Sequence, residues 1–132
     1  MNIIYRSDYV PTAQQVITLY KESDLPRPVE NEQRIQKMLD NASVIVTAWN
    51  NDQLIGVCRS ITDWVWCCYV SDLSVSPAYK KSGIGKKLIE MTKEKVGEQC
   101  MILLLSVPTA MSYYPRIGFA KDDRAFSIPR TN

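Results

Sequence analysis

The most informative part of the chain reads Val75-Ser76-Pro77-Ala78-Tyr79-Lys80-Lys81-Ser82-Gly83-Ile84-Gly85-Lys86-Lys87. It joins an apolar, strand-like run at residues 69–75 to an amphipathic, helix-like run at residues 84–96. Gly83 and Gly85 stand at the junction, where residues without a Cβ allow positive φ and the close approach of a ligand to the backbone. The stretch therefore predicts a strand–loop–helix unit with an accessible main chain at its bend.

The charges around the two glycines predict an anion site. No acidic residue occurs between Asp72 and Glu90, and four lysines flank the glycines: Lys80, Lys81, Lys86 and Lys87. The last two fall in the first helical turn, where the helix dipole disfavours cations. Free N–H groups at a helix start together with lysines form a phosphate site. The alternative is a plain turn with solvated lysines, but strand, helix and lysine cluster together favour the phosphate site.

Length and composition limit the classes of protein that the chain can belong to. Its 132 residues fit one domain, residues 1–132. A net charge of +2 is too small to indicate a nucleic-acid partner. No apolar run approaches the roughly 20 residues of a membrane span, and the first residues lack the layout of a signal peptide. We therefore expect a cytoplasmic protein without a membrane or nucleic-acid partner.

The cysteines and the missing histidines narrow the chemistry. The four cysteines contain no Cys-x-x-Cys pair, so we expect small buried thiols and no metal site. The chain has no histidine, which excludes Ser-His-Asp and Cys-His catalysis. Acid–base chemistry must then use Tyr, Asp, Glu, Lys, Cys or water.

Hydrophobic periodicity predicts an α+β fold. Thr12 and Gln15 form a capping box, and Asn31 can cap a second helix that follows the break at residues 25–28. Further helices are predicted at residues 85–96 and 110–117, and strands at residues 3–6, 43–49, 53–61, 64–75, 101–105 and 125–129. The continuously apolar strand at 101–105 should be covered on both faces. This order of elements indicates a mixed α/β layer fold with a mixed sheet.

Two motifs resemble those of the GNAT superfamily of N-acetyltransferases. Residues 80–85 resemble motif A, Q/R-x-x-G-x-G/A, with Lys80 in place of Gln or Arg. Residues 110–119 are similar to motif B, Ala-x-x-aromatic-Tyr-x-x-x-Gly-Phe. The motifs stand in the family's order, and the resemblance covers essentially the whole chain. It implies a single GNAT-like domain with a mixed central sheet and helices on both faces.

The resemblance also implies acetyl-CoA as cosubstrate. Its pyrophosphate would lie on the loop and helix start, formed by Ser82, Gly83, Ile84, Gly85 and Lys86. Further phosphate contacts or steering would come from Lys80, Lys81 and Lys87, although lysine lacks the fork of arginine. The pantetheine arm would add to the preceding strand at Leu73, Ser74 and Val75. A backbone N–H there would polarise the thioester carbonyl.

The motif B position of Tyr114 implies a general acid that protonates the leaving thiolate, with Tyr113 as the alternative. Either ring could instead pack on the core. Pro115 interrupts the helix predicted around these tyrosines.

Asp72 could deprotonate or orient an amine, or could simply be a polar residue that caps a bulge or meets a neighbouring strand. Glu22 and Asp24, near the end of the first helix, could hold a cationic acceptor. Trp64 and Trp66 could wall an acceptor pocket or belong to the core. Cys67 or Cys68 as a nucleophile is disfavoured, because no base partner is visible.

The implied activity is the direct transfer of acetyl to a primary amine of a small molecule or a protein, and a homodimer is common in the family. Two other functions stay open: a GNAT-like domain that senses acetyl-CoA without turnover, and a protein that binds another phosphate ligand such as a nucleotide.

Overall fold

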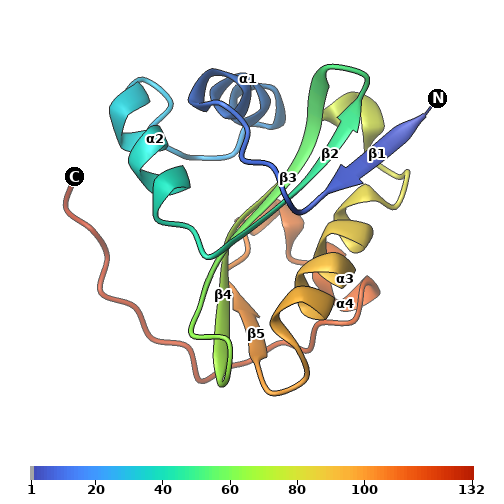
Figure 1. Ribbon diagram of the computed structural model, residues 1–132. Helices are drawn as coiled ribbons and strands as arrows, with labels where there is room; N and C mark the ends of the chain where they lie inside the picture. The colour runs from blue at the N-terminus through green and yellow to red at the C-terminus, as the bar shows by residue number, and fades with distance from the viewer. Residues whose placement is uncertain (1) are drawn as a thin grey trace.

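The computed structural model describes residues 2–132 (Figure 1). Within them, five strands form one sheet in the order β1-β2-β3-β4-β5. Neighbouring strands are antiparallel except for β4 and β5, which are parallel. The predicted mixed sheet is therefore confirmed. Its strands are β1 (Ile3–Arg6), β2 (Val44–Asn50), β3 (Gln53–Thr62), β4 (Cys67–Val75) and β5 (Met101–Leu104).

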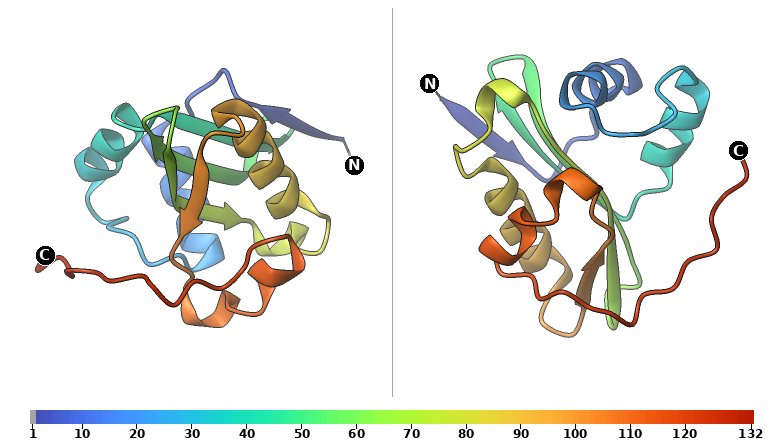
Figure 2. Two further views of the ribbon diagram at one scale, coloured as in Figure 1. Left: turned by 90° about the horizontal axis from the view of Figure 1, so that it is seen from below. Right: turned by 180° about the vertical axis from the view of Figure 1, so that it is seen from behind.

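The helices form a layer on each face of the sheet (Figure 2). Helices α1 (Ala13–Ser23) and α2 (Glu32–Asp40) cover one face, and α3 (Ile84–Val96) covers the other. The two predicted caps are confirmed. Thr12 and Gln15 form a reciprocal capping box, and the Asn31 side chain accepts a hydrogen bond from the Arg34 amide.

Helix α3 approaches the sheet closely at a glycine. A Cβ added to Gly56 of β3 would lie 3.1 Å from side-chain atoms of both Ile84 and Leu88. Those two side chains are fully buried and belong to the core on this face. The contact fixes the start of α3, and with it the glycine loop, against the centre of the sheet.

Strands β4 and β5 are paired along only part of β4, and the point after Val70 where their pairing ends is called the fork. β5 pairs with β4 only from Cys67 to Val70. In the described part of the chain, β4 from Ser71 onward has a paired neighbour on the β3 side alone. The half of β4 that leads into the glycine loop thus presents a free edge.

The helix predicted at residues 110–117 is wrong in its extent. The structure has a 3₁₀ turn at Pro108–Ala110 and a short helix, α4 (Tyr113–Arg116). A continuous helix would need an amide hydrogen at position 115, which proline lacks. Proline is tolerated in the first turn of a helix that begins at Tyr113, because no intrahelical bond is required there.

The last predicted strand is also wrong. Among residues 2–132, the segment 125–129 pairs with no strand, and Phe126 and Ile128 are each 97% exposed. The expectation that residues 101–105 are covered on both faces is also wrong, since Met101 and Leu105 stay exposed.

Candidate active site

The loop between β4 and α3 has the backbone form that its glycines predict. Lys81 and Gly83 have positive φ angles of 73° and 76°, and Gly83 is the N-cap of α3. Within the described residues, no side chain caps this helix start. Helix geometry leaves the first amides, from Ile84 to Lys86, without carbonyl partners in the helix. They are available to an anion.

The side chains around these amides are positive. Lys80, Lys81, Lys86 and Lys87 are all exposed, and the first turn of α3 contains no acidic residue. The Ser82 hydroxyl donates a hydrogen bond to the Tyr79 carbonyl oxygen at 2.7 Å, which holds the turn closed on itself. The loop therefore combines a fixed backbone with uncompensated positive charge, as a phosphate site requires.

The α4 tyrosines lie against this helix start. A Cβ added to Gly85 would collide with the hydroxyl and ring of Tyr113, so the tyrosine occupies the space that glycine leaves. Tyr114 packs edge-to-face on Tyr113 at 5.3 Å between ring centroids and on Phe119 at 5.6 Å. Burial raises the pKa of both tyrosines above 10.0, so each hydroxyl keeps its proton at neutral pH.

The predicted cofactor segment of β4 lies along the fork. Leu73 and Val75 pack toward the α3 side of the sheet. Ser74 is buried on the other side, where its Oγ lies 2.5 Å from Oγ of Ser23. A free strand edge can bind an extended ligand through main-chain hydrogen bonds. The free edge, the glycine loop and the two tyrosines are thus contiguous.

Asp72 does not have the surroundings of a general base. It is fully buried on the α1 face, and both carboxylate oxygens are engaged. Arg27 Nε lies 2.6 Å from Oδ1, Arg59 Nε lies 2.6 Å from Oδ2, and the Tyr20 hydroxyl donates to Oδ2 at 2.7 Å. The expectation that Asp72 deprotonates an amine is replaced by the other one weighed, a polar residue that meets a neighbouring strand.

The electrostatics agree with this structural role. Burial alone would raise the pKa of Asp72, but the hydrogen bond and charge of Arg59, helped by Arg27 and Tyr20, hold the pKa below its ordinary value. Burial and the Asp72 charge raise the pKa of Tyr20 well above 10.0. A carboxylate that binds protons this weakly inside the protein is a poor proton acceptor.

Sequence reasoning missed the partners of Asp72, namely Tyr20, Arg27 and Arg59. A signal for Arg59 was present, because this arginine interrupts the strand-forming run of residues 54–61. Arginine is almost never fully buried unless it is paired. One acidic residue in the next strand, Asp72, was available as its partner.

The predicted acceptor residues Glu22 and Asp24 lie at the end of α1. Glu22 accepts a hydrogen bond from the Ser76 hydroxyl at 3.2 Å, which ties α1 to the segment that follows β4. Asp24 is exposed and caps α1 in a left-handed conformation with φ of 58°. Glu22 therefore lies near the start of the glycine-loop segment, and Asp24 follows it two residues later. In the left view of Figure 2, the end of α1 and α4 lie on the same side of the molecule.

Trp64 lies away from this cluster. It stands in the turn between β3 and β4, is 45% exposed, and has a positive φ of 74°. The Asp63 carboxylate holds the turn by accepting hydrogen bonds from the backbone amides of Val65, Trp66 and Cys67. At about 3.3 Å per residue, β4 separates this turn from Val75 by roughly 25 Å or more. The expected acceptor role of Trp64 therefore has no support from its position, and exposed Cys67 is at the same remote end.

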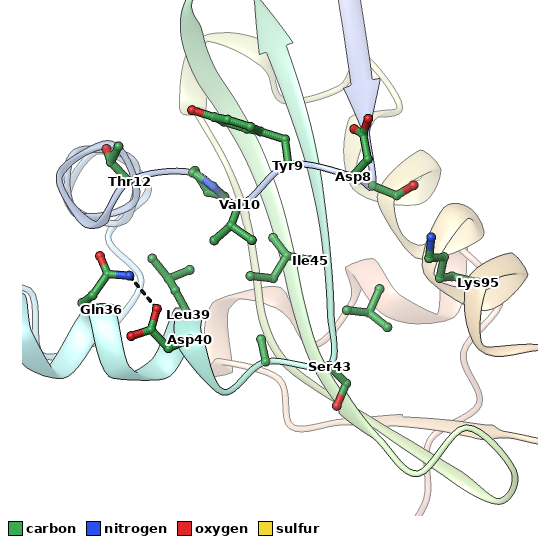
Figure 3. A pocket seen from close by; sticks show the side chains of 14 residues that line it. Asp8, Tyr9, Val10, Thr12, Gln36, Leu39, Asp40, Ser43, Ile45 and Lys95 are labelled. Carbon is green, nitrogen blue, oxygen red and sulfur yellow. Dashed lines mark hydrogen bonds between the residues drawn. The ribbon is translucent and has the colours of Figure 1, made fainter.

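A separate hollow lies beside the connection between β1 and α1 (Figure 3). The β1–α1 connection, the end of α2, the start of β2 and Lys95 of α3 line it. Its two carboxylates are engaged, Asp8 by Arg6 at 3.3 Å and Asp40 by Gln36 at 2.8 Å. None of the predicted site residues lines this hollow, so it is not the site described above.

Comparison with known proteins identifies the family. The family model described as "Acetyltransferase (GNAT) family" matches residues 9–119, which include the glycine loop and both α4 tyrosines. The chain belongs to the acetyltransferase (GNAT) family. The resemblance of the two motifs is thereby confirmed at the level of the family.

Two curated relatives of this GNAT chain are uncharacterized N-acetyltransferases. The Prochlorococcus marinus protein is 27% identical over 104 residues, which are 74% of this chain and 56% of that protein. The Pyropia yezoensis protein is 26% identical over 95 residues, which are 67% and 55% of the two chains. The chain thus matches only about half the length of these relatives.

Solved structures share the GNAT fold. A Staphylococcus aureus protein of unknown function has a TM-score of 0.83 at 21% identity, covering 98% of this chain and 100% of its own. A GNAT family acetyltransferase from Streptococcus pneumoniae has a TM-score of 0.76 at 23% identity, covering 99% and 100%. The predicted fold class is confirmed. Over residues 2–132, no helix combines the length and the apolar character that a membrane crossing requires.

Proposed function

We propose that this GNAT protein is an acetyl-CoA-dependent N-acetyltransferase that moves acetyl directly to a primary amine of a small molecule or a protein. The observation that supports the proposal is the contiguity of three features: an uncapped, lysine-ringed helix start, a free edge of β4, and the hydroxyl-bearing ring of Tyr114. Acetyl-CoA supplies an activated acetyl thioester.

The residues present fit such a cosubstrate. The amides of Ser82, Gly83, Ile84, Gly85 and Lys86 would bind the pyrophosphate, because no side chain of the described chain caps α3. The side chains of Lys80, Lys81 and Lys87 would add positive charge. Leu73, Ser74 and Val75 would bind the extended arm through their main chain, and a backbone N–H of this segment would stabilise the carbonyl oxygen as it gains charge.

The proton transfers that the reaction needs suggest a role for Tyr114. During transfer the amine nitrogen bonds to the acetyl carbon and the carbon–sulfur bond breaks. The nitrogen gives a proton to water, the sulfur gains a proton from the general acid, and water returns a proton to that acid. Burial raises the pKa of Tyr114, so its hydroxyl is protonated over the whole neutral range and can give that proton to sulfur. Glu22 and Asp24 would orient a cationic acceptor, which must reach the fork as the neutral amine.

One observation favours a second function, an acetyl-CoA-binding regulatory module without turnover. Asp72, which could have been a base, is fully engaged by two arginines and a tyrosine. A domain with the glycine loop intact and no base would bind acetyl-CoA and leave it unchanged.

The test combines binding and turnover on the wild type and on Tyr114→Phe. Titration calorimetry should give heat with acetyl-CoA and none with ATP, and release of the coenzyme A thiol should rise above background with at least one amine of a broad panel. Tyr114→Phe should lower kcat by about 10²-fold or more, within the range for general acids, with the acetyl-CoA Kd changed less than twofold.

The control is Tyr113→Phe, because the Tyr113 hydroxyl lies over Gly85. It should change the acetyl-CoA Kd more than it changes kcat. Binding without turnover of any amine would favour the regulatory module, and no heat with acetyl-CoA would reject both functions.

A further inference from the structure

Ser71 forms a bulge in β4 at the point where the fork opens. Arg59 of β3 pairs with Asp72, but the next residue of β3, Ser60, pairs with Val70. Ser71 is therefore the extra residue, and it directly follows Val70, the last residue paired with β5. Bulges redirect the strand and its main-chain groups. This one sets the direction in which the free edge of β4 continues.

Two arginines hold the polar atoms of the bulge. Arg27 Nη2 donates to the Ser71 carbonyl oxygen at 2.7 Å, and Arg59 Nη2 donates to the Ser71 hydroxyl at 2.8 Å. The same hydroxyl lies 3.3 Å from Oδ1 of Asp72. The network thus contacts both the main chain and the side chain of the bulged residue.

The network contains one more positive charge than it needs for a structural ion pair. Arg59 and Asp72, with side chains 7% and 0% exposed, already form a buried pair of opposite charges. Arg27 adds a second guanidinium to the same carboxylate and leaves the cluster with a net positive charge. Charge neutralisation therefore does not explain why a second arginine is present. The segments that Arg27 connects offer an explanation.

Arg27 connects the loop between α1 and α2 to the fork. It belongs to residues 23–30, which are the last residue of α1 and most of the loop after it. This segment follows Glu22 and includes Asp24, and these are the two carboxylates proposed for the acceptor. Its guanidinium spans three points: Nη1 to the Pro26 carbonyl of its own loop at 2.7 Å, Nε to Asp72 and Nη2 to Ser71. The planar guanidinium group of arginine suits such multiple contacts, and lysine cannot reproduce them.

We propose that Arg27 is a positioning residue, which fixes the acceptor loop at residues 23–30 to the bulge of β4 and thereby sets the distance between the acceptor amine and the thioester. This inference rests on the proposed function. Arg27 acts through Ser71 and Asp72 and does not itself touch the reacting atoms.

The test uses Arg27→Met and Arg27→Lys, with Arg34→Met as the control. Arg34 is an exposed arginine of α2 whose Nη2 contacts only the terminal Asn132 carbonyl at 3.1 Å among the described residues. Well below the unfolding midpoint, Arg27→Met should lower kcat at least tenfold and change the acetyl-CoA Kd less than threefold. The kcat of Arg27→Lys should fall almost as far, because one ammonium group cannot bridge three acceptors. Guanidinium chloride at a few millimolar should restore part of the rate of Arg27→Met and leave Arg34→Met unchanged.

Hydrogen exchange separates this inference from the proposed function. In Arg27→Met, amides of residues 23–30 and of residues 71–73 should exchange faster together, while Arg34→Met leaves both unchanged. Faster exchange at both segments supports the proposed positioning role of Arg27 even if no amine is turned over. Unchanged exchange at either segment, or a kcat that falls only in proportion to the folded fraction, overturns it.

Discussion

At the residue scale, Asp72 shows how one buried carboxylate organises three side chains from different elements. Tyr20 comes from α1, Arg27 from the following loop and Arg59 from β3. Removing one partner of such a buried cluster leaves uncompensated charge inside the protein and costs about 3–5 kcal/mol. Asp72→Asn should therefore lower the free energy of unfolding by about that amount, as measured by chemical denaturation at pH 6.

The depressed pKa of Asp72 gives this prediction a pH dependence. Folded Asp72 binds its proton more weakly than the unfolded chain does, whose ordinary value is 3.8. The contribution of Asp72 is thus complete above about pH 4–5 and is lost as pH falls through the lower, folded pKa. The gap in unfolding free energy between wild type and Asp72→Asn should narrow from pH 5 to pH 2.

A matched control is Asp8→Asn, which removes an exposed carboxylate that also contacts an arginine, Arg6, at 3.3 Å. Exposed pairs contribute little, so this variant should unfold like the wild type across the same pH range. A gap that stays constant with pH for Asp72→Asn would contradict the assigned direction of its pKa.

At the element scale, helix α3 has lysines at both ends and only one end should favour them. Lys86 and Lys87 stand in its first turn, and Lys93 and Lys95 in its last. Cations stabilise the C-terminal end of a helix and destabilise the N-terminal end by roughly 0.3–1 kcal/mol each. The N-terminal pair is therefore retained at some cost in stability, which fits a role in ligand binding.

Replacing both members of a pair by methionine tests this difference. Lys86→Met with Lys87→Met should weaken acetyl-CoA binding about tenfold at low salt and flatten its salt dependence, without lowering the unfolding midpoint. Lys93→Met with Lys95→Met should leave binding unchanged and slightly lower the midpoint. Calorimetry at two salt concentrations and thermal unfolding measure both effects, and equal losses of affinity in the two variants would contradict the anion site.

The elements that sequence patterns predicted correctly are those with local signals. The capping box at Thr12, the cap at Asn31 and the glycine junction before α3 each depend on residues within a few positions of one another. The segment 125–129 had strand-forming residues, but a strand exists only where an edge pairs with it, and the sequence does not state which edges are free.

The candidate site also has a part with local sequence signals and a part that depends on distant residues. The glycine loop follows from consecutive residues and the local dipole, so its backbone geometry could be predicted. The partners of Asp72 lie 13, 45 and 52 positions away along the chain, at Arg59, Arg27 and Tyr20. Tertiary contacts of that kind have no local signature, apart from the isolated charge of Arg59 in an apolar strand.

At the scale of the whole molecule, the C-terminal segment contributes little to the packed structure. Residues 121–132 are exposed throughout, and neither hydrophobic core includes Phe126 or Ile128. Removing residues 121–132 should change the thermal midpoint by less than about 2 °C, since exposed side chains have little burial to lose. Differential scanning calorimetry of the two chains measures this, and a larger drop would mean that the segment packs against the domain in solution.

Because β4 and β5 are paired only as far as Val70, the free edge of β4 lies between the two helical layers. The glycine loop belongs to the α3 layer, and the Arg27 loop belongs to the α1–α2 layer. A donor seated from one face and an acceptor arriving from the other would not obstruct each other's path. Under the proposed function both substrates can therefore be bound at once, and initial rates should give intersecting rather than parallel double-reciprocal lines.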